Sequence, residues 1–157
     1  MRPRLDVDAL EELKIVQAIR GLKARYFRAI DYKDWSAYRM AFADDAVLDV
    51  SGEAHDGSAP PLVHGGDAIA AFVSGQLAGM ITVHQGHMDE IDVIDSDNAT
   101  GIWALHDILI WPEGAAIRRL EGYGHYHECY RSDPAGWKIT SLRLSRIHVD
   151  IETSGRV

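Results

Sequence analysis

The chain has 157 residues, of which 46% are hydrophobic and 25% charged, as is ordinary for one globular domain. Its formal net charge is −8, which argues against nucleic acid as a partner, because phosphate binding needs clustered lysine and arginine. The single cysteine, Cys129, excludes an internal disulfide, no apolar run approaches the roughly 20 residues of a membrane span, and the first residues lack the apolar core of a signal peptide. We therefore expect a cytoplasmic protein with no membrane partner.

The first half of the chain is predicted to be mainly helical. Val16, Ile19 and Leu22 belong to a series of apolar residues spaced three and four apart, which is the helical signal. The predicted elements are a helix over 8–30, a second helix over 35–43 after the N-cap Asp34, a short strand over 46–50, a loop over 51–66 and a third helix over 67–79. The close group of basic residues on the first helix, which we interpret as a solvated face, is Arg20, Lys23, Arg25 and Arg28.

From Met80 onward the character of the sequence changes to that of strands separated by turns. The predicted strands cover about 81–94, 99–111, 116–131 and 137–150. Helices followed by a long meander predict an α+β fold, in which a cone-shaped, curled antiparallel sheet (an α+β barrel) is capped by three N-terminal helices. We expect a single domain over 1–157, with a ligand cavity between the concave face of the sheet and the first helix.

Three stretches of the sequence carry a recognisable pattern. Residues 26–35 and 42–46 contain a tyrosine, an aspartate and the run Phe-Ala-Asp-Asp-Ala. Residues 64–69 read as the start of a helix, and residues 124–130 with 136–139 read as a last hairpin. In this order and spacing, over almost the whole chain, they resemble the SnoaL-like, nuclear-transport-factor-2-like superfamily. The resemblance implies the same fold, but one scaffold of this kind serves many chemistries and some non-enzymes.

An aspartate and a histidine stand at positions that suit proton transfer. Asp31 follows the first helix, and His84 lies near the start of the first long strand. The pair resembles the Asp–His dyad of the scytalone dehydratase and hexachlorocyclohexane dehydrochlorinase families, which implies that the histidine takes a proton from carbon while a leaving group departs. An imidazole has an ordinary pKa near ~6.5, so it can act as a base at neutral pH, and a carboxylate at its other ring nitrogen fixes the tautomer.

Other positions depart from these families. Ile30 and Val50 stand where the resemblance places two substrate-binding tyrosines of scytalone dehydratase, and neither can donate a hydrogen bond. Val50 also stands where ketosteroid isomerase carries its aspartate base, which argues against that isomerisation. Arg131 matches an arginine that the dehydrochlorinase carries near its last hairpin turn, so we expect it to bind substrate.

Alternation along the strands predicts which further side chains line the cavity. Tyr126 and Glu128 share one strand face. Of His106 and Asp107 one must point inward, and His106 is favoured because its neighbours on that face are apolar, although a plain core histidine is an equal alternative. The expected lining, beyond Asp31 and His84, is Tyr26, Val50, His106, Tyr126, Glu128 and Arg131.

His125 and His127 form a pair on one strand face, a spacing that can chelate zinc or copper. By alternation they face away from the cavity, and no third ligand stands at a diagnostic spacing. We therefore expect no metal and no other cofactor.

Three functions remain open for this chain. The first is a lyase that eliminates water or another group from a small cyclic or aromatic-like substrate. The second is a polyketide cyclase or isomerase that uses the same acid–base groups. The third is a non-catalytic module for ligand binding or subunit association, like the small subunits of aromatic-ring dioxygenases, and the Asp31–His84 pair argues against it. A curled sheet with an open outer face also predicts a homodimer or homotrimer.

Overall fold

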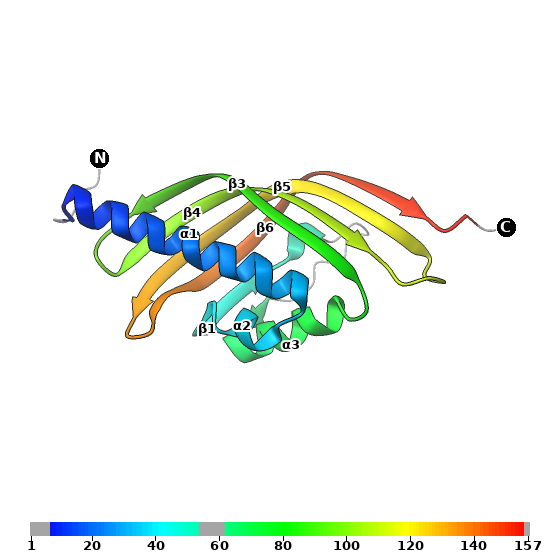
Figure 1. Ribbon diagram of the computed structural model, residues 1–157, viewed down its shortest axis with the longest axis horizontal. Coiled ribbons are helices and arrows are strands. Elements are labelled where there is room, and N and C mark those ends of the chain that lie inside the picture. Colours follow the sequence, from blue (N-terminus) through cyan, green and yellow to red (C-terminus); the bar gives the residue numbers. More distant parts are fainter. Residues whose placement is uncertain (1–6, 54–61, 156–157) are drawn as a thin grey trace.

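Helices and strands follow the predicted order, with the helices in the first half of the chain. The computed structural model describes residues 7–53 and 62–155. The elements are α1 (Ala9–Tyr32), α2 (Trp35–Arg39), β1 (Phe42–Asp49), the 3-10 helix η1 (Ser51–Glu53), β2 (Val63–His64), α3 (Gly66–Gln76), β3 (Ile81–Val93), β4 (Asn98–Ile110), β5 (Ile117–Asp133) and β6 (Gly136–Thr153). The predicted α+β fold is confirmed, with α1 lying across a curved sheet (Figure 1). Among the described residues, no helix is both long and apolar enough to cross a membrane.

Helix α1 begins and ends at residues that suit its two ends. The Asp8 side chain caps the N-terminus by accepting a hydrogen bond from the backbone N–H of Glu11 at 2.8 Å. Lys33 closes the C-terminus in the left-handed conformation, with φ of 61°. The helix therefore runs past its predicted end at residue 30, and its last turn includes Asp31. Its buried side chains are Ile15, Ile19, Leu22, Lys23, Tyr26, Ala29 and Ile30.

The region after α1 differs from the prediction. Helix α2 ends at Arg39 rather than at residue 43, because the residues that follow join the sheet. Strand β1 begins at Phe42 and runs parallel to β6, with Phe42 opposite Ile139. The sheet is therefore mixed rather than purely antiparallel. Part of the predicted loop over 51–66, namely residues 54–61, lies outside the described residues.

The sheet has six strands in the order β2-β1-β6-β5-β4-β3, and the four long strands β3 to β6 pair antiparallel with one another. Its inner face carries the core: along β4, Trp103 and Leu105 are buried and Ala104 between them is more exposed. Gly86 on the inner face of β3 lets α1 approach closely, because a Cβ there would lie 2.7 Å from the Phe27 ring. This approach sets the end of α1 against the start of β3.

Candidate functional site

Asp31 and His84 meet where the last turn of α1 lies against β3. The Nδ1 atom of His84 is 2.7 Å from Oδ1 of Asp31, and the backbone N–H of His84 donates to Oδ2 at 2.9 Å. The predicted contact is therefore present. Because a carboxylate can only accept here, Nδ1 carries a proton, and in the neutral ring Nε2 is then the acceptor.

Thr82 holds the Asp31 carboxylate, and Lys33 in turn holds Thr82. The Thr82 hydroxyl donates to Oδ1 of Asp31 at 2.9 Å, and Nζ of Lys33 donates to the Thr82 hydroxyl at 2.6 Å. Lys33 also donates to the carbonyl of Ile30 at 3.2 Å. Partial burial lowers the pKa of Lys33, and the Asp31 carboxylate opposes that shift. A chain of donors thus fixes the carboxylate that faces His84.

The side chains of the Asp31–His84 pair are mostly, but not completely, buried. The His84 side chain is 8% exposed and that of Asp31 is 21% exposed. On β3, His84 shares the inner face with buried Thr82, whereas Ile81 and Val83 point outward and are exposed. The Asp31 carboxylate is therefore partly open to solvent, whereas the His84 ring is largely covered.

A second pair of charged side chains is buried beside His84. Asp107 stands opposite His84 in the pairing of β3 with β4, so their Cβ atoms are roughly 4.5–5.5 Å apart on the same face. The Asp107 carboxylate accepts two hydrogen bonds from Arg146, each of 2.8 Å, and the two side chains are 3% and 8% exposed. The wall next to the imidazole is therefore polar and fixed. Nothing in the strand pattern had singled out Arg146.

Gly122 makes room for this ion pair, and a Cβ at that position would come within 2.5 Å of the Asp107 carboxylate. Gly122→Ala is expected to lower the free energy of unfolding by about 1–3 kcal/mol, because the added methyl group overpacks the site. The matched control is Gly75→Ala in α3, where nothing lies within 4 Å of the new Cβ. That control is expected to raise stability by up to about 1 kcal/mol. Urea unfolding measures both, and equal stabilities would mean that the ion pair is not held in place.

Lys23, which the sequence placed on a solvated helix face, is buried. Its side chain is 1% exposed and its ammonium lies 2.5 Å from Oε1 of Glu128. The ammonium is also 3.9 Å from the centre of the Tyr26 ring and 3.7 Å from that of Tyr126. Burial lowers the pKa of Lys23, and Glu128 opposes the shift. Lys23 is buried because it lies between Ile19 and Tyr26 on the apolar face of α1.

Three predicted lining residues, Tyr26, Tyr126 and Glu128, converge on this lysine. All three are buried, at 3–4% exposure, so the predicted inward phase of this part of β5 is confirmed. Glu128 also accepts a hydrogen bond from the Tyr130 hydroxyl. Burial raises the pKa of Tyr26 and of Tyr126 well above the ordinary value. The Lys23 ammonium fills the space between these residues, where the sequence predicted an open pocket.

His106 faces away from this interior, which corrects the prediction that it points inward. Asp107 takes the inward position. On the outer face His106 pairs with Glu121 at 2.8 Å and stacks on Tyr123, with ring centres 4.8 Å apart. Hydrogen bonds from His106, Arg119 and Tyr123 hold the pKa of Glu121 down at about 2. The outer face of β4 is apolar as well, so apolar neighbours did not identify the inner face.

Two other residues, Arg131 and Val50, were expected to line the cavity. Arg131 lies on the outer face of β5 and donates to the Asp45 carboxylate at 2.7 Å, with both side chains exposed. The alternation that places Glu128 and Tyr130 inside places Arg131 outside, which corrects the expectation that it lines the cavity. Val50 follows β1 and packs, half-buried, against the core.

The remaining candidate groups do not gather at the Asp31–His84 pair. His125 and His127 are half-exposed on the outer face, with ring centres 6.3 Å apart. Within residues 7–53 and 62–155, no group of three or more histidine, cysteine, aspartate or glutamate side chains is arranged to hold a metal ion. Two surface clefts, of about 650 and 620 Å³, are lined by other residues: one lies beside α1 and the other at the turn between β4 and β5.

Comparison with known proteins gives one family and several similar structures. The SnoaL-like domain family matches residues 11–143. A candidate aromatic ring hydroxylase from Novosphingobium aromaticivorans is 23% identical, with a TM-score of 0.77 over 90% of this chain and 94% of that one. A candidate scytalone dehydratase from the same organism is 15% identical, with a TM-score of 0.79 over 94% of each chain. A type 2 hexachlorocyclohexane dehydrochlorinase is 17% identical, with a TM-score of 0.78 over 96% of this chain and 97% of that one. At these identities the likeness shows a shared fold.

Proposed function

The chain belongs to the SnoaL-like family, and from that premise we propose that it is a cofactor-independent lyase acting on a small cyclic or aromatic-like molecule. The observation that carries the proposal is the hydrogen bond of 2.7 Å between Asp31 and His84, made by a carboxylate that Thr82 and the His84 backbone also hold. A histidine fixed in this way presents Nε2 as a base. Similar folds in proteins described as a dehydratase and a dehydrochlorinase support an elimination.

The proposed reaction is an elimination across two neighbouring carbons. Nε2 of His84 takes a proton from one carbon, and the electron pair of that C–H bond forms a double bond to the next carbon. The leaving group departs from that second carbon with the electrons of its own bond. Asp31 stabilises the imidazolium that forms. The imidazolium then gives its proton to a departing hydroxide, forming water, or to solvent when the leaving group is a halide.

The surroundings of His84 support a substrate that is apolar on one side and polar on the other. Two residues along β3, a Cβ at Gly86 would lie 2.7 Å from the Phe27 ring and 3.4 Å from the Trp103 ring. On the neighbouring strand β4 stands Asp107, which forms an ion pair with Arg146 of β6. Flat rings suit the aromatic side, and an oxygen substituent suits the charged side.

The test is a small panel of substrates incubated in deuterium oxide. The panel contains a cyclic β-hydroxy ketone, a cyclic β-chloro ketone and the parent ketone without a leaving group. A lyase is expected to convert the first two into the conjugated enone, seen by its ultraviolet absorbance. Deuterium exchange in the parent ketone without elimination from the others would replace the lyase by an isomerase or cyclase. Neither elimination nor exchange would favour a module that binds a ligand without chemistry.

Asp31→Asn tests the tautomer on which this mechanism depends. The backbone N–H of His84 is expected to hold the amide oxygen, so the amide NH₂ faces Nδ1 and moves the ring proton to Nε2. Nε2 then no longer accepts a proton. Nitrogen chemical shifts of His84 in a ¹⁵N-histidine sample measure the change. Retention of the Nδ1–H tautomer in the variant would contradict the assigned role of Asp31, and His106 in the same spectrum serves as the unchanged reference.

The same proposal includes association of the chain with itself. Large apolar side chains on the outer face of the sheet are exposed: Ile81, Val83, Ile102, Ile110 and Tyr123. Exposed apolar surface of this kind favours an interface, and a homodimer or homotrimer would cover it. We expect no nucleic-acid partner, in keeping with the net charge of −8.

A further inference from the structure

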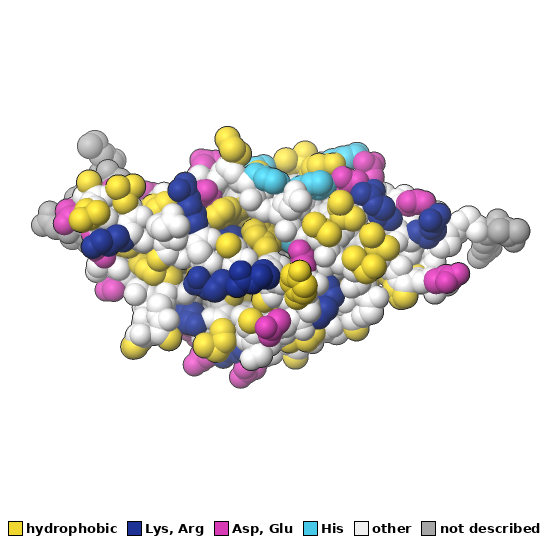
Figure 2. Space-filling view, viewed as in Figure 1, with side chains coloured by type: hydrophobic (Ala, Val, Ile, Leu, Met, Phe, Trp, Pro, Cys, Tyr) yellow, Lys and Arg dark blue, Asp and Glu magenta, His cyan; other side chains and the backbone are white. Residues whose placement is uncertain are grey.

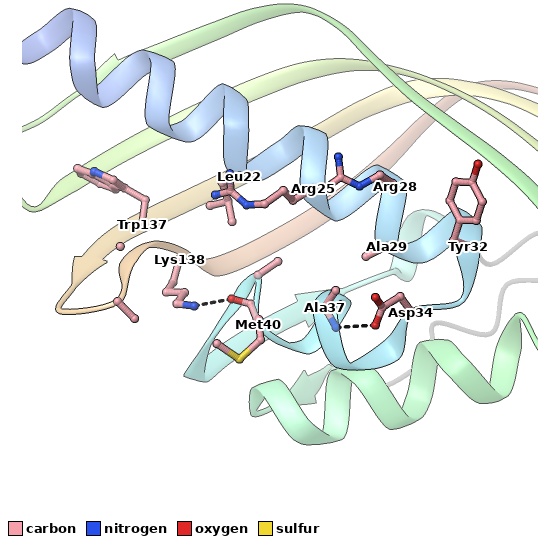
Figure 3. A pocket seen from close by; sticks show the side chains of 13 residues that line it. Leu22, Arg25, Arg28, Ala29, Tyr32, Asp34, Ala37, Met40, Trp137 and Lys138 are labelled. Carbon is pink, nitrogen blue, oxygen red and sulfur yellow. Dashed lines mark hydrogen bonds between the residues drawn. The ribbon is translucent and has the colours of Figure 1, made fainter.

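A cleft lies beside α1, lined by neither Asp31 nor His84. It has a volume of about 650 Å³ and is bounded by α1, by α2 and by the turn between β5 and β6 (Figure 3). Leu22, Ala29 and Ala41 are buried and form its apolar floor. The half-buried ring of Trp137 closes one end. Clefts of roughly 300–1,000 Å³ with mostly apolar walls are the usual size for small-molecule sites.

Two arginines on the rim of this cleft carry charge that the described residues do not neutralise. Arg25 and Arg28 are exposed and one helical turn apart on α1, and neither has a carboxylate or carbonyl partner within residues 7–53 and 62–155. Six of the seven other arginines in the described part of the chain have carboxylate partners: Arg20, Arg39, Arg118, Arg119, Arg131 and Arg146. Figure 2 shows the positive side chains that gather over the middle of this face.

The opposite rim adds a third cation. Nζ of Lys138 donates to the carbonyl of Met40 at 2.5 Å, which fixes its ammonium at the lower side of the cleft (Figure 3). The acid that lines the cleft, Asp34, is occupied as the N-cap of α2, where it accepts from Ala37 N at 3.0 Å. The cleft therefore holds an excess of positive charge in a chain whose net charge is −8.

A glycine inside α1 accommodates one of the arginines. A Cβ at Gly21 would lie 3.2 Å from Nη1 of Arg25, closer than such contacts usually are. Glycine within a helix costs roughly 0.5–1 kcal/mol relative to alanine, so this position gives up helix stability. The Arg25 guanidinium lies along the helix above the cleft, as Figure 3 shows.

We propose that this cleft binds a small organic anion, namely a carboxylate carried on a flat apolar body. The carboxylate lies against the guanidinium groups of Arg25 and Arg28, which match its planar geometry. The flat body lies on the apolar floor with one edge against Trp137, because an aromatic side chain favours another ring in stacked or edge contact. The site is separate from the Asp31–His84 pair and independent of the reaction proposed there.

The experiment uses naphthoate as the probe and its neutral amide, naphthamide, as the matched ligand. Isothermal titration measures the affinity of each for the full chain, for Arg25→Gln/Arg28→Gln, and for Arg20→Gln, which removes an exposed arginine elsewhere on α1. The full chain and the Arg20 variant are expected to bind naphthoate equally. The double variant is expected to bind it at least about tenfold more weakly, because two charge-assisted hydrogen bonds are lost. Naphthamide is expected to bind all three chains as weakly as naphthoate binds the double variant.

The location of the probe is checked by NMR of the indole N–H groups, assigned with Trp137→Phe. Naphthoate is expected to shift the Trp137 signal and to bind His84→Ala as it binds the full chain. Equal binding of naphthoate and naphthamide, or equal binding by the double variant, would overturn the proposal. So would loss of binding in His84→Ala, since the probe would then occupy the Asp31–His84 site, and so would an absence of binding at millimolar concentration.

Discussion

Replacing His84 by alanine is expected to lower the rate of elimination by about 10²–10⁴-fold, which is what a positioned base contributes. The loss follows from the removal of Nε2, the acceptor that the Asp31 carboxylate leaves free by holding Nδ1 at 2.7 Å. The fold is expected to survive, because the alanine leaves Asp31 its hydrogen bonds from Thr82 and from the backbone of residue 84. The measurement is the initial rate of enone formation from whichever panel substrate the full chain converts.

His106→Ala is the matched control for this variant. His106 also touches a carboxylate, that of Glu121 at 2.8 Å, but it does so on the outer face of the sheet. Its removal is expected to leave the rate unchanged, so the comparison separates a base in the interior from a histidine–carboxylate pair in general. A rate that survives in His84→Ala, with both variants folded by circular dichroism, would remove His84 from the mechanism.

The Asp31–His84 pair could be predicted because two independent signals agreed on it. Helical spacing ended near Ile30 and strand spacing began near Met80, which put the aspartate at a helix end and the histidine at a strand start. The resemblance to the SnoaL-like superfamily then implied that these two places adjoin. Spacing alone could not show that they adjoin, because the chain between them contains helices α2 and α3 and strands β1 and β2.

The residues around the pair could not be predicted, for reasons that differ from case to case. Alternation separates His106 from Asp107 without saying which face is inner, and both faces of β4 are apolar. Arg146 continues the alternation of buried Leu142 and Leu144 along β6, but no local pattern links its guanidinium to Asp107, which is 39 residues away. Strand β1 was predicted too short because its parallel partner comes nearly a hundred residues later.

The burial of Lys23 was not predicted, because its charge was taken as a sign of exposure although its position in the helical pattern indicated the buried face. Helical spacing places it on the buried face of α1, and a lysine on such a face needs a buried acid to be tolerated. That acid, Glu128, is more than a hundred residues away, so no local pattern links the two. A lysine within an apolar stripe and an unexplained inward glutamate are together a signal for a buried ion pair.

Lys23→Met is expected to lower the free energy of unfolding by about 3–5 kcal/mol, the usual effect of removing one partner of a buried ion pair. Methionine fills a similar volume, so the loss comes from the charge left on Glu128, whose side chain is fully buried. The hydrogen bond from Tyr130 remains but does not neutralise that carboxylate. Urea unfolding at neutral pH measures the loss, and Arg20→Met, which opens the exposed pair with Asp89, is expected to change stability by no more than about 1 kcal/mol.

The double variant Lys23→Met/Glu128→Gln separates charge from packing. Glutamine keeps an acceptor for the Tyr130 hydroxyl and carries no charge, so most of the lost stability is expected to return. For the same reason the penalty of Lys23→Met is expected to shrink as the pH is lowered, because a protonated glutamate side chain can be buried without a counter-ion. If the double variant is as unstable as the single one at every pH, then the aliphatic stem and ammonium of Lys23 stabilise the fold through Tyr26 and Tyr126 rather than through Glu128. The ion pair would then be a consequence of the packing around α1, not the reason that the lysine is tolerated there.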